Sequence, residues 1–303
     1  MGAVGVGALL LILALGWLWT PDIDRPTLEA RYARGPADFT EVAGMRLHLR
    51  DDGPKNAPAL VLLHGFGGSL HSWEPWAQAL SADYRVIRYD QPGAGLSAPD
   101  PTGDYTDERG MQVLVALMDR LGLARATIVG HSMGGRLAWR FAAAQPQRVD
   151  KLVLVAPDGF ASPGFEYGKA PDAGLAVQAM RYVLPKALVG MSLQPAYADP
   201  AVMSDELLTR YHQLLLAPGT RDAMIRRTEQ LVLVRPPTIL ETIPAPTLLL
   251  WGAQDAMIPV ANADDYLKAM PNARLVTLPG VGHLPQEEAQ QASVAALRAF
   301  LRE

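Results

Sequence analysis

The chain has 303 residues, of which 49% are hydrophobic and 19% charged, and this composition indicates a large packed core, not a disordered or repetitive chain. A formal net charge of −4 provides no basic surface for a phosphate backbone, so we expect no nucleic-acid partner. The absence of cysteine excludes disulfides, thiolate nucleophiles and thiolate metal sites.

An uncharged stretch, residues 2–19, opens the chain. As a helix with about 1.5 Å rise per residue it spans roughly 27 Å, enough to cross the hydrocarbon core of a bilayer, with Trp17 and Trp19 at the interface. We therefore expect residues 1–20 to anchor the protein in a membrane, on a side that stays open. The alternative is a cleaved signal peptide and a secreted form, but a basic n-region and an A-x-A site before Pro21 are both missing.

The next part of the chain predicts a linker and then a series of strands. Residues 21–38 are polar and are interpreted as a linker, and residues 39–42 and 45–50 alternate apolar and polar side chains around Gly44, as in a β-hairpin. Nearly continuous apolar runs that end in loops with Gly, Pro or Asp predict strands buried on both faces. These runs are residues 59–63, 85–90, 126–130, 151–156, 246–251 and 273–278.

Helical patterns alternate with these strands. Residues 107–121 carry apolar side chains at three-and-four spacing, which predicts a helix with one buried stripe. The expected fold class is α/β, with a mostly parallel, doubly wound sheet of about eight strands. Residues 158–240 interrupt the alternation with helical patterns only, at 175–189, 203–216 and 221–234. We predict a core of residues 39–157 and 241–303 and an inserted helical cap, residues 158–240, over the carboxyl ends of the strands.

A serine motif marks one strand-to-helix junction. Gly130-His131-Ser132-Met133-Gly134 follows the predicted strand 126–130 and precedes a helical pattern at 136–144. This is the place of a G-x-S-x-G nucleophile elbow, in which glycines on both sides leave room for a sharp turn that exposes the serine. A glycine-rich turn without chemistry is the alternative. We predict Ser132 as the nucleophile.

Two further residues follow in the chain order that such a site requires. Asp255 and His283 both lie in loops just after predicted strands. Such loops open on one edge of a parallel sheet, so residues far apart in sequence can meet there. We predict that His283 accepts the serine proton and that Asp255 orients the histidine ring. Asp158, which also follows a strand, is the rival acid, and no other histidine follows Asp255 in sequence.

The glycine-rich loop His64-Gly65-Phe66-Gly67-Gly68 predicts an oxyanion hole. We expect the backbone N–H groups of Phe66 and Met133 to face the developing negative charge, the second from the N-terminus of a helix. A tight turn is the alternative, and the lack of a Walker spacing disfavours a phosphate loop. The side chains of Trp73 and Met133 are predicted to line the substrate pocket. Without an H-E-x-x-H motif or a dinucleotide loop, no metal or cofactor is expected.

The elbow, the H-G-F-G-G loop, the stretch D-Q-P-G-A-G-L-S at 90–97, W-G-x-x-D and G-x-G-H together resemble the α/β-hydrolase superfamily, in its serine esterase and lipase branch, over residues 39–303. With its N-terminal segment and cap the chain is similar to membrane-anchored monoacylglycerol lipases, and its core is similar to meta-cleavage-product hydrolases. The presence of Ser132 in place of an aspartate argues against dehalogenases and epoxide hydrolases.

This resemblance implies a serine hydrolase that cleaves a carboxylic ester, of an apolar or lipid-derived substrate, through an acyl-Ser132 intermediate. Two alternatives stay open. One is a carbon–carbon bond hydrolase of the meta-cleavage type that uses the same three residues. The other is a non-catalytic, membrane-tethered binding protein that keeps the fold without the chemistry. The sequence does not indicate an oligomeric state.

Overall fold

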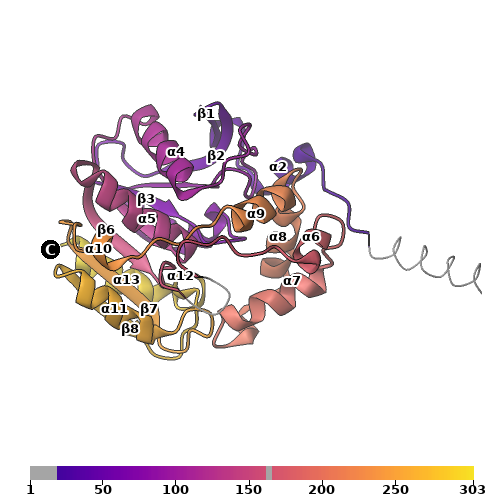
Figure 1. The fold of residues 1–303 in the computed structure, drawn as a ribbon. Helices are drawn as coiled ribbons and strands as arrows, with labels where there is room; N and C mark the ends of the chain where they lie inside the picture. The colour runs from indigo at the N-terminus through magenta and orange to yellow at the C-terminus, as the bar shows by residue number, and fades with distance from the viewer. Residues whose placement is uncertain (1–18, 162–165) are drawn as a thin grey trace, which may run out of the picture.

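A computed structural model describes residues 19–161 and 166–303, which fold around an eight-stranded sheet (Figure 1). The strand order is β1-β2-β4-β3-β5-β6-β7-β8. Strands β1 and β2 are antiparallel to each other, β2 is antiparallel to β4, and the other neighbours run parallel. The predicted fold class is confirmed. The strands are β1 Phe39–Val42, β2 Met45–Asp52, β3 Ala59–Leu63, β4 Arg85–Tyr89, β5 Ala126–His131, β6 Val149–Val155, β7 Thr247–Gly252 and β8 Ala273–Leu278.

The predicted hairpin forms at the edge of this sheet. Phe39 pairs with His48 and Val42 pairs with Met45. The two residues between the strands, Ala43 and Gly44, have φ angles of 51° and 80°. Positive φ at both central positions is typical of a tight type I′ turn, whose twist matches that of the strands.

Helices cover both faces of the sheet, which explains why its central strands are apolar throughout. Alternate side chains of β3 enter different layers: Val61 and Leu63 pack with α4 and α5, whereas Leu60 and Leu62 pack with α3 and α13. Each face therefore has its own hydrophobic core. The covering helices are α3 Glu74–Leu80, α4 Asp107–Arg120, α5 Met133–Ala144, α10 Pro237–Leu240, α11 Ala263–Ala269, α12 Pro285–Glu288 and α13 Gln290–Leu301. Short 3₁₀ turns are η1 Pro36–Asp38, η2 Leu70–Trp73, η3 Pro146–Arg148, η4 Gln194–Ala196, η5 Pro200–Val202 and η6 Val260–Asn262.

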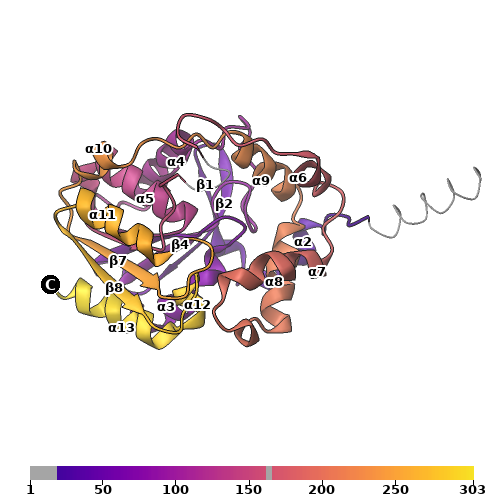
Figure 2. The ribbon, with the colours of Figure 1, turned by 60° about the horizontal axis from the view of Figure 1, so that its bottom comes forward.

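The interval that we predicted as a cap contains helices α6 Leu175–Ala179, α7 Lys186–Leu193, α8 Asp205–Leu215 and α9 Thr220–Glu229. These helices lie together on one side of the molecule, away from β7, β8 and α13 (Figures 1 and 2). The single helix expected at 175–189 is wrong, because the chain forms two helices separated by a turn. Pro185 caps the second one, and a proline disfavours helical backbone at the residue before it and cannot donate a backbone hydrogen bond.

Residues 21–38, interpreted above as a linker, form a packed segment. It contains helix α2 Arg25–Tyr32, which begins where the Asp24 carboxylate accepts a hydrogen bond of 3.0 Å from Thr27 N. Leu28, which is 1% exposed, packs in one cluster with Leu96 and Leu214. In both views α2 lies close to the helices of the predicted cap (Figures 1 and 2). This segment is thus held both by the loop that contains Leu96 and by α8, which contains Leu214.

The predicted membrane anchor, residues 1–20, lies outside the described residues except for Trp19 and Thr20. Across residues 19–161 and 166–303, no helix has both the length and the apolar character needed to traverse a bilayer. The indole of Trp19 stacks on the ring of Tyr182 at 5.6 Å, and Thr20 N donates a hydrogen bond of 2.8 Å to Tyr182 O. The chain therefore enters the described part in contact with the turn between α6 and α7.

Candidate active site

Ser132 occupies a strained turn between β5 and α5. Its φ is 53° and its ψ is −121°, in a region that a side chain normally avoids. A Cβ atom on Gly130 would lie 2.2 Å from Gly134 O, and one on Gly134 would lie 2.4 Å from Leu63 O. Only glycine fits at these two positions, so the G-x-S-x-G pattern has a direct steric cause. The turn holds the serine at the carboxyl end of β5.

Asp255 and His283 meet across the loops that follow β7 and β8. The His283 Nδ1 and Asp255 Oδ2 atoms are 2.7 Å apart, and both side chains are buried. Asp255 Oδ1 accepts hydrogen bonds of 2.9 Å from Met257 N and 2.8 Å from Ile258 N. Because both oxygens of the carboxylate are engaged, its orientation toward the ring is fixed. The structure thus brings the predicted acid and base together.

The backbone of His283 is held from two directions. Its N–H donates a hydrogen bond of 2.7 Å to Ala196 O, in the interval predicted as a cap. Its carbonyl oxygen accepts a hydrogen bond of 2.8 Å from His131 Nε2, the residue before Ser132. Burial, followed by the nearby His283, lowers the pKa of His131 well below its usual value, so its ring is neutral. The histidine loop is therefore tied to the serine turn as well as to the helical interval.

Ser132 and His283 line one cavity of about 270 Å³. Among the described residues, no hydrogen bond joins the Ser132 hydroxyl to the His283 ring. Such bonds are often long without substrate and tighten when it binds. Apolar side chains also line this cavity, among them those of Phe66, Met257 and Ile258.

The loop 64–68 lies directly against the serine turn. A Cβ atom on Gly65 would be 3.1 Å from Ser132 Cβ, so the two backbones approach closely. His64 Nδ1–H donates to Gly65 O at 2.8 Å, and His64 Nε2 accepts from Gln91 N at 2.9 Å. Burial lowers the pKa of His64, which keeps this ring neutral. The histidine of the H-G-F-G-G motif thus fixes the shape of the loop.

Phe66 and Met133, the predicted oxyanion-hole residues, both line the cavity. Met133 is the first residue of α5, where a backbone N–H has no partner within the helix. Phe66 lies in the tight turn of the loop, and its side chain is 50% exposed at the cavity rim. The structure is thus compatible with two N–H donors facing one space beside Ser132.

Trp73 requires a correction. We expected its side chain in the substrate pocket, but it is fully buried and stacks at a tilt on Trp76, with ring centroids 5.0 Å apart. It belongs to the apolar layer beneath α3 and does not line the cavity that holds Ser132. The turn η2, which follows the loop 64–68, directs the indole into the core. Met133, the other predicted pocket residue, does line the cavity.

Asp158, the rival acid, is bound to an arginine that sequence reasoning missed. Arg136 forms ion pairs with Asp158 and, at 2.9 Å, with Asp107 of α4. Burial alone would lower the pKa of Arg136, but these two carboxylates outweigh it and raise the pKa. The structure therefore pairs His283 with Asp255 and not with Asp158. An arginine on the buried face of the helix after the elbow was the available signal, since a buried guanidinium needs a carboxylate partner.

Within residues 19–161 and 166–303, no group of three or more His, Cys, Asp or Glu side chains is arranged to hold a metal ion.

Comparison with known proteins places the chain among others of the same fold. A family model described as the alpha/beta hydrolase fold matches residues 58–290. The chain is 33% identical to a dihydrolipoyllysine-residue acetyltransferase component of the acetoin cleaving system of Pseudomonas putida, over 98% of this chain and 80% of that protein. It is 32% identical to a 2-hydroxy-6-oxononadienedioate/2-hydroxy-6-oxononatrienedioate hydrolase of Burkholderia vietnamiensis, over 92% of this chain and 98% of that protein.

Among solved structures, a membrane phospholipase A, described as a bacterial virulence factor, is similar over the whole chain. It is 25% identical, with a TM-score of 0.76, and the match covers 100% of this chain and 98% of that one. These similarities extend over both the sheet and the helical interval between β6 and β7.

Proposed function

Since the chain belongs to the alpha/beta-hydrolase fold family, we propose that it is a serine hydrolase that cleaves a carboxylic ester of an apolar or lipid-derived substrate. The observation that carries this proposal is the shared cavity of Ser132 and His283, together with the 2.7 Å contact between His283 and Asp255. A serine on a strained turn, a buried histidine and a carboxylate that orients it are the parts that acyl transfer requires.

The proposed reaction proceeds through an acyl-serine. His283 Nε2 accepts the Ser132 proton while the serine oxygen attacks the ester carbonyl. The carboxylate of Asp255 keeps the other ring proton on Nδ1 and stabilises the imidazolium that forms. The N–H groups of Phe66 and Met133 donate to the oxyanion, and His283 then protonates the leaving alcohol. Water, activated by the same ring, releases the acid and restores Ser132.

The cavity supports a small acyl or alkyl group. Its volume of about 270 Å³ lies just below the range for ligand pockets, which is roughly 300–1,000 Å³. Phe66, Met133, Leu231, Met257 and Ile258 give it apolar walls. A space of this size suits one chain of an ester better than the two chains of an intact diacyl lipid. Esters with a single short or medium acyl chain are therefore the proposed substrates.

The proposal includes the membrane anchor expected at residues 1–20. It is supported by the match over the whole chain to a protein described as a membrane phospholipase A. An enzyme held at a membrane would meet lipid-derived esters at high local concentration.

The test is covalent labelling followed by a substrate panel. A fluorophosphonate probe is expected to label the wild-type protein and not Ser132→Ala, with Ser81→Ala, at the end of α3, as the control that keeps its label. The panel contains p-nitrophenyl esters and monoacylglycerols of increasing chain length. Absence of both labelling and hydrolysis would favour the non-catalytic binding protein.

A second candidate is carbon–carbon bond hydrolysis, because the relative from Burkholderia vietnamiensis carries the name of such an enzyme and is matched over 98% of its length. It needs the same serine, histidine and aspartate. A ring-fission product is therefore added to the panel. Turnover of that compound, together with inactivity on every ester, would replace the esterase proposal by this one.

A further inference from the structure

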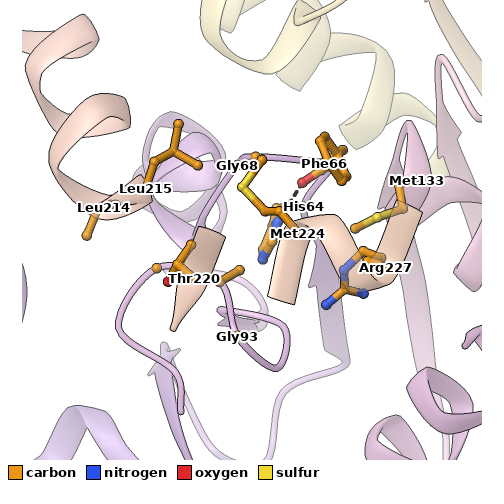
Figure 3. A pocket seen from close by; sticks show the side chains of 14 residues that line it. His64, Phe66, Gly68, Gly93, Met133, Leu214, Leu215, Thr220, Met224 and Arg227 are labelled. Carbon is orange, nitrogen blue, oxygen red and sulfur yellow. Dashed lines mark hydrogen bonds between the residues drawn. The ribbon is translucent and has the colours of Figure 1, made fainter. Parts of the chain in front are cut away.

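An arginine without a carboxylate partner lines the cavity of Ser132 and His283. Arg227 lies on α9 and lines this cavity, as well as an adjoining hollow that shares Phe66 and Met133 with it. Figure 3 shows Arg227 and Met133 among the side chains that line the adjoining hollow, and both residues also line the cavity of Ser132. Its position is therefore within the proposed active site and not on the outer surface of the helix.

The partners of Arg227 are few. Its Nη2 donates a hydrogen bond of 2.8 Å to Pro92 O, and its Cζ lies 5.2 Å from the centre of the Tyr105 ring. No carboxylate of the described residues lies within ion-pair distance of it. A guanidinium has five N–H donors and stays charged in proteins. Among the described residues, only the bond to Pro92 O engages one of the donors of Arg227. Arg227 is half-buried, and burial is the first cause that lowers the pKa of its guanidinium. A charge that is partly removed from water and has no counterion is held at a cost.

The neighbouring charges do not compensate for it. Arg136, which lines the same cavity, is paired with Asp158 and Asp107. Asp107, whose charge also acts on Arg227, is shared with Arg140 at 3.0 Å. The acidic groups near the cavity are thus engaged by other arginines. Of the charged side chains described around this cavity, Arg227 is the cation that lacks an opposing carboxylate.

We propose that Arg227 binds an anionic group of the substrate, a phosphate or a carboxylate, and so makes the enzyme selective for esters that carry negative charge beside the scissile bond. This inference rests on the proposed ester hydrolysis and names its substrate class more closely. The planar fork of a guanidinium matches the paired oxygens of both groups and binds them through charge-assisted hydrogen bonds. The substrate's anion would supply the counterion that the protein does not.

The experiment compares neutral and anionic esters of equal acyl length. One pair is a monoacylglycerol and the 1-acyl lysophosphatidic acid with the same chain, and the other is p-nitrophenyl butyrate and mono-p-nitrophenyl succinate. Arg227→Gln is expected to lower the ratio of kcat/KM for the anionic over the neutral member by about 10- to 100-fold, since hydrogen bonds to charged groups are strong. If this ratio falls in the first pair and not in the second, the bound group is a phosphate. If it falls in the second pair and not in the first, the bound group is a carboxylate.

Matched variants separate this role from a structural one. Arg226→Gln removes the neighbouring, exposed guanidinium of the same helix and is expected to leave both ratios within about twofold of wild type. Arg227→Lys keeps the charge and is expected to recover part of the selectivity. Thermal unfolding of each variant reports on folding. Equal ratios in wild type and a folded Arg227→Gln would overturn the inference even if ester hydrolysis is confirmed.

A binding measurement keeps the inference testable if no ester is turned over. Calorimetric titration of Ser132→Ala with the lysophosphatidic acid and with the monoacylglycerol reports affinity without chemistry. Adding Arg227→Gln to this background is expected to weaken binding of the anionic ligand about tenfold. Equal affinity with and without Arg227 overturns the inference. If the wild type hydrolyses no ester but the Ser132→Ala protein binds the anionic ligand more tightly through Arg227, the proposed function is contradicted and this inference is not.

Discussion

The substitution Asp255→Asn tests the proposed acid through hydrogen-bond geometry. Asp255 Oδ1 accepts from two backbone N–H groups, at 2.9 Å and 2.8 Å, and Oδ2 faces His283 Nδ1 at 2.7 Å. An asparagine of the same shape keeps its carbonyl oxygen on the backbone donors. Its NH₂ group then points at Nδ1, so Nδ1 must become an acceptor and the ring proton moves to Nε2. His283 can then no longer accept the serine proton.

The expected loss in kcat is about 10⁴-fold, which is the effect of the wrong tautomer in enzymes of this kind. The fold should persist, because the two backbone hydrogen bonds to residue 255 are retained. This magnitude separates the acid from its rival. Asp158→Asn removes one partner of Arg136, which keeps its ion pair of 2.9 Å with Asp107. We expect it to reduce the free energy of unfolding while leaving kcat within about threefold of wild type.

Both variants are assayed by the rate of fluorophosphonate labelling and by kcat/KM for a p-nitrophenyl ester that the wild type hydrolyses. Thermal unfolding shows whether each variant is folded at the assay temperature. The reasoning is refuted if Asp255→Asn keeps more than about a tenth of the wild-type activity. It is also refuted if Asp158→Asn, in its folded state, loses as much activity as Asp255→Asn.

Three further predictions concern stability and follow from particular contacts. Gly134→Ala should lower the free energy of unfolding, measured by urea titration, by roughly 3 kcal/mol or more, because the added Cβ would lie 2.4 Å from a backbone oxygen of β3. Gly174→Ala is the control: its Cβ would lie in open space, and it should have little effect in the same titration. Leu28→Ala should lower the free energy of unfolding by about 2–4 kcal/mol if residues 21–38 are packed as described. Leu175 is 90% exposed, and Leu175→Ala should lower it by less than about 0.5 kcal/mol. Equal effects of the two substitutions would contradict the packing of α2. Burial lowers the pKa of His71 to about 3, whereas its pKa in the unfolded chain is about 6.5. Between these two pH values the unfolded chain binds more protons than the folded one, so the free energy of unfolding decreases as the pH falls from 6.5 toward 3. The decrease from this group is at most about 1.4 kcal/mol per pH unit. The slope of unfolding free energy against pH between about 7 and 4.5 should be shallower in His71→Asn, and an identical slope would show that another group causes the loss.

The sheet was predictable because its strands are buried on both faces. A strand such as β3 has no polar position, and the predicted range 59–63 matches it residue for residue. Helix boundaries in the interval 158–240 were harder, since packing against neighbours decides them there. The apolar spacing at 175–189 continued through Pro185, although a proline at that point ends one helix and begins another. Periodicity alone cannot show such a break.

Residues 21–38 illustrate a second limit. Helix α2 has one buried residue, Leu28, and half of its residues carry charged or hydroxyl side chains without an aromatic ring, so its composition is that of a linker. Its order comes from tertiary contacts: Arg25 donates to Leu96 O and to Pro218 O, each at 3.1 Å, and Ile23 N donates to Leu216 O at 2.9 Å. Contacts between residues so distant in sequence leave no local pattern. They had to be seen in the structure.

For the candidate site, motifs with a steric cause were the informative ones. The glycines around Ser132 are required by backbone contacts, so the pattern and the geometry coincide. The ion pairs of Arg136 and the unpaired state of Arg227 depend on which side chains converge from α4, α5 and α9. Sequence spacing carries no information on such convergence. Charge balance around a cavity therefore becomes visible only once the fold is known.

The helical interval and the histidine loop form one unit, and this restricts how substrate can enter. Besides the bond from His283 N to Ala196 O, the Glu287 carboxylate accepts hydrogen bonds from Tyr197 at 2.6 Å and from Tyr211 at 3.0 Å. A motion that lifted these tyrosines from α12 would also release the backbone of His283.

The side chains at the rim of the cavity have no such connection to His283. Phe66 and Met257 are about half exposed there, and neither side chain takes part in the bonds that hold the histidine loop. Rotation of these two side chains would widen the entrance while the geometry of His283 and Asp255 is preserved. A substrate chain that enters between them reaches Ser132 with Arg227 on the α9 side of the same cavity. The proposed selection by charge and the proposed hydrolysis then need no opening of the helical interval.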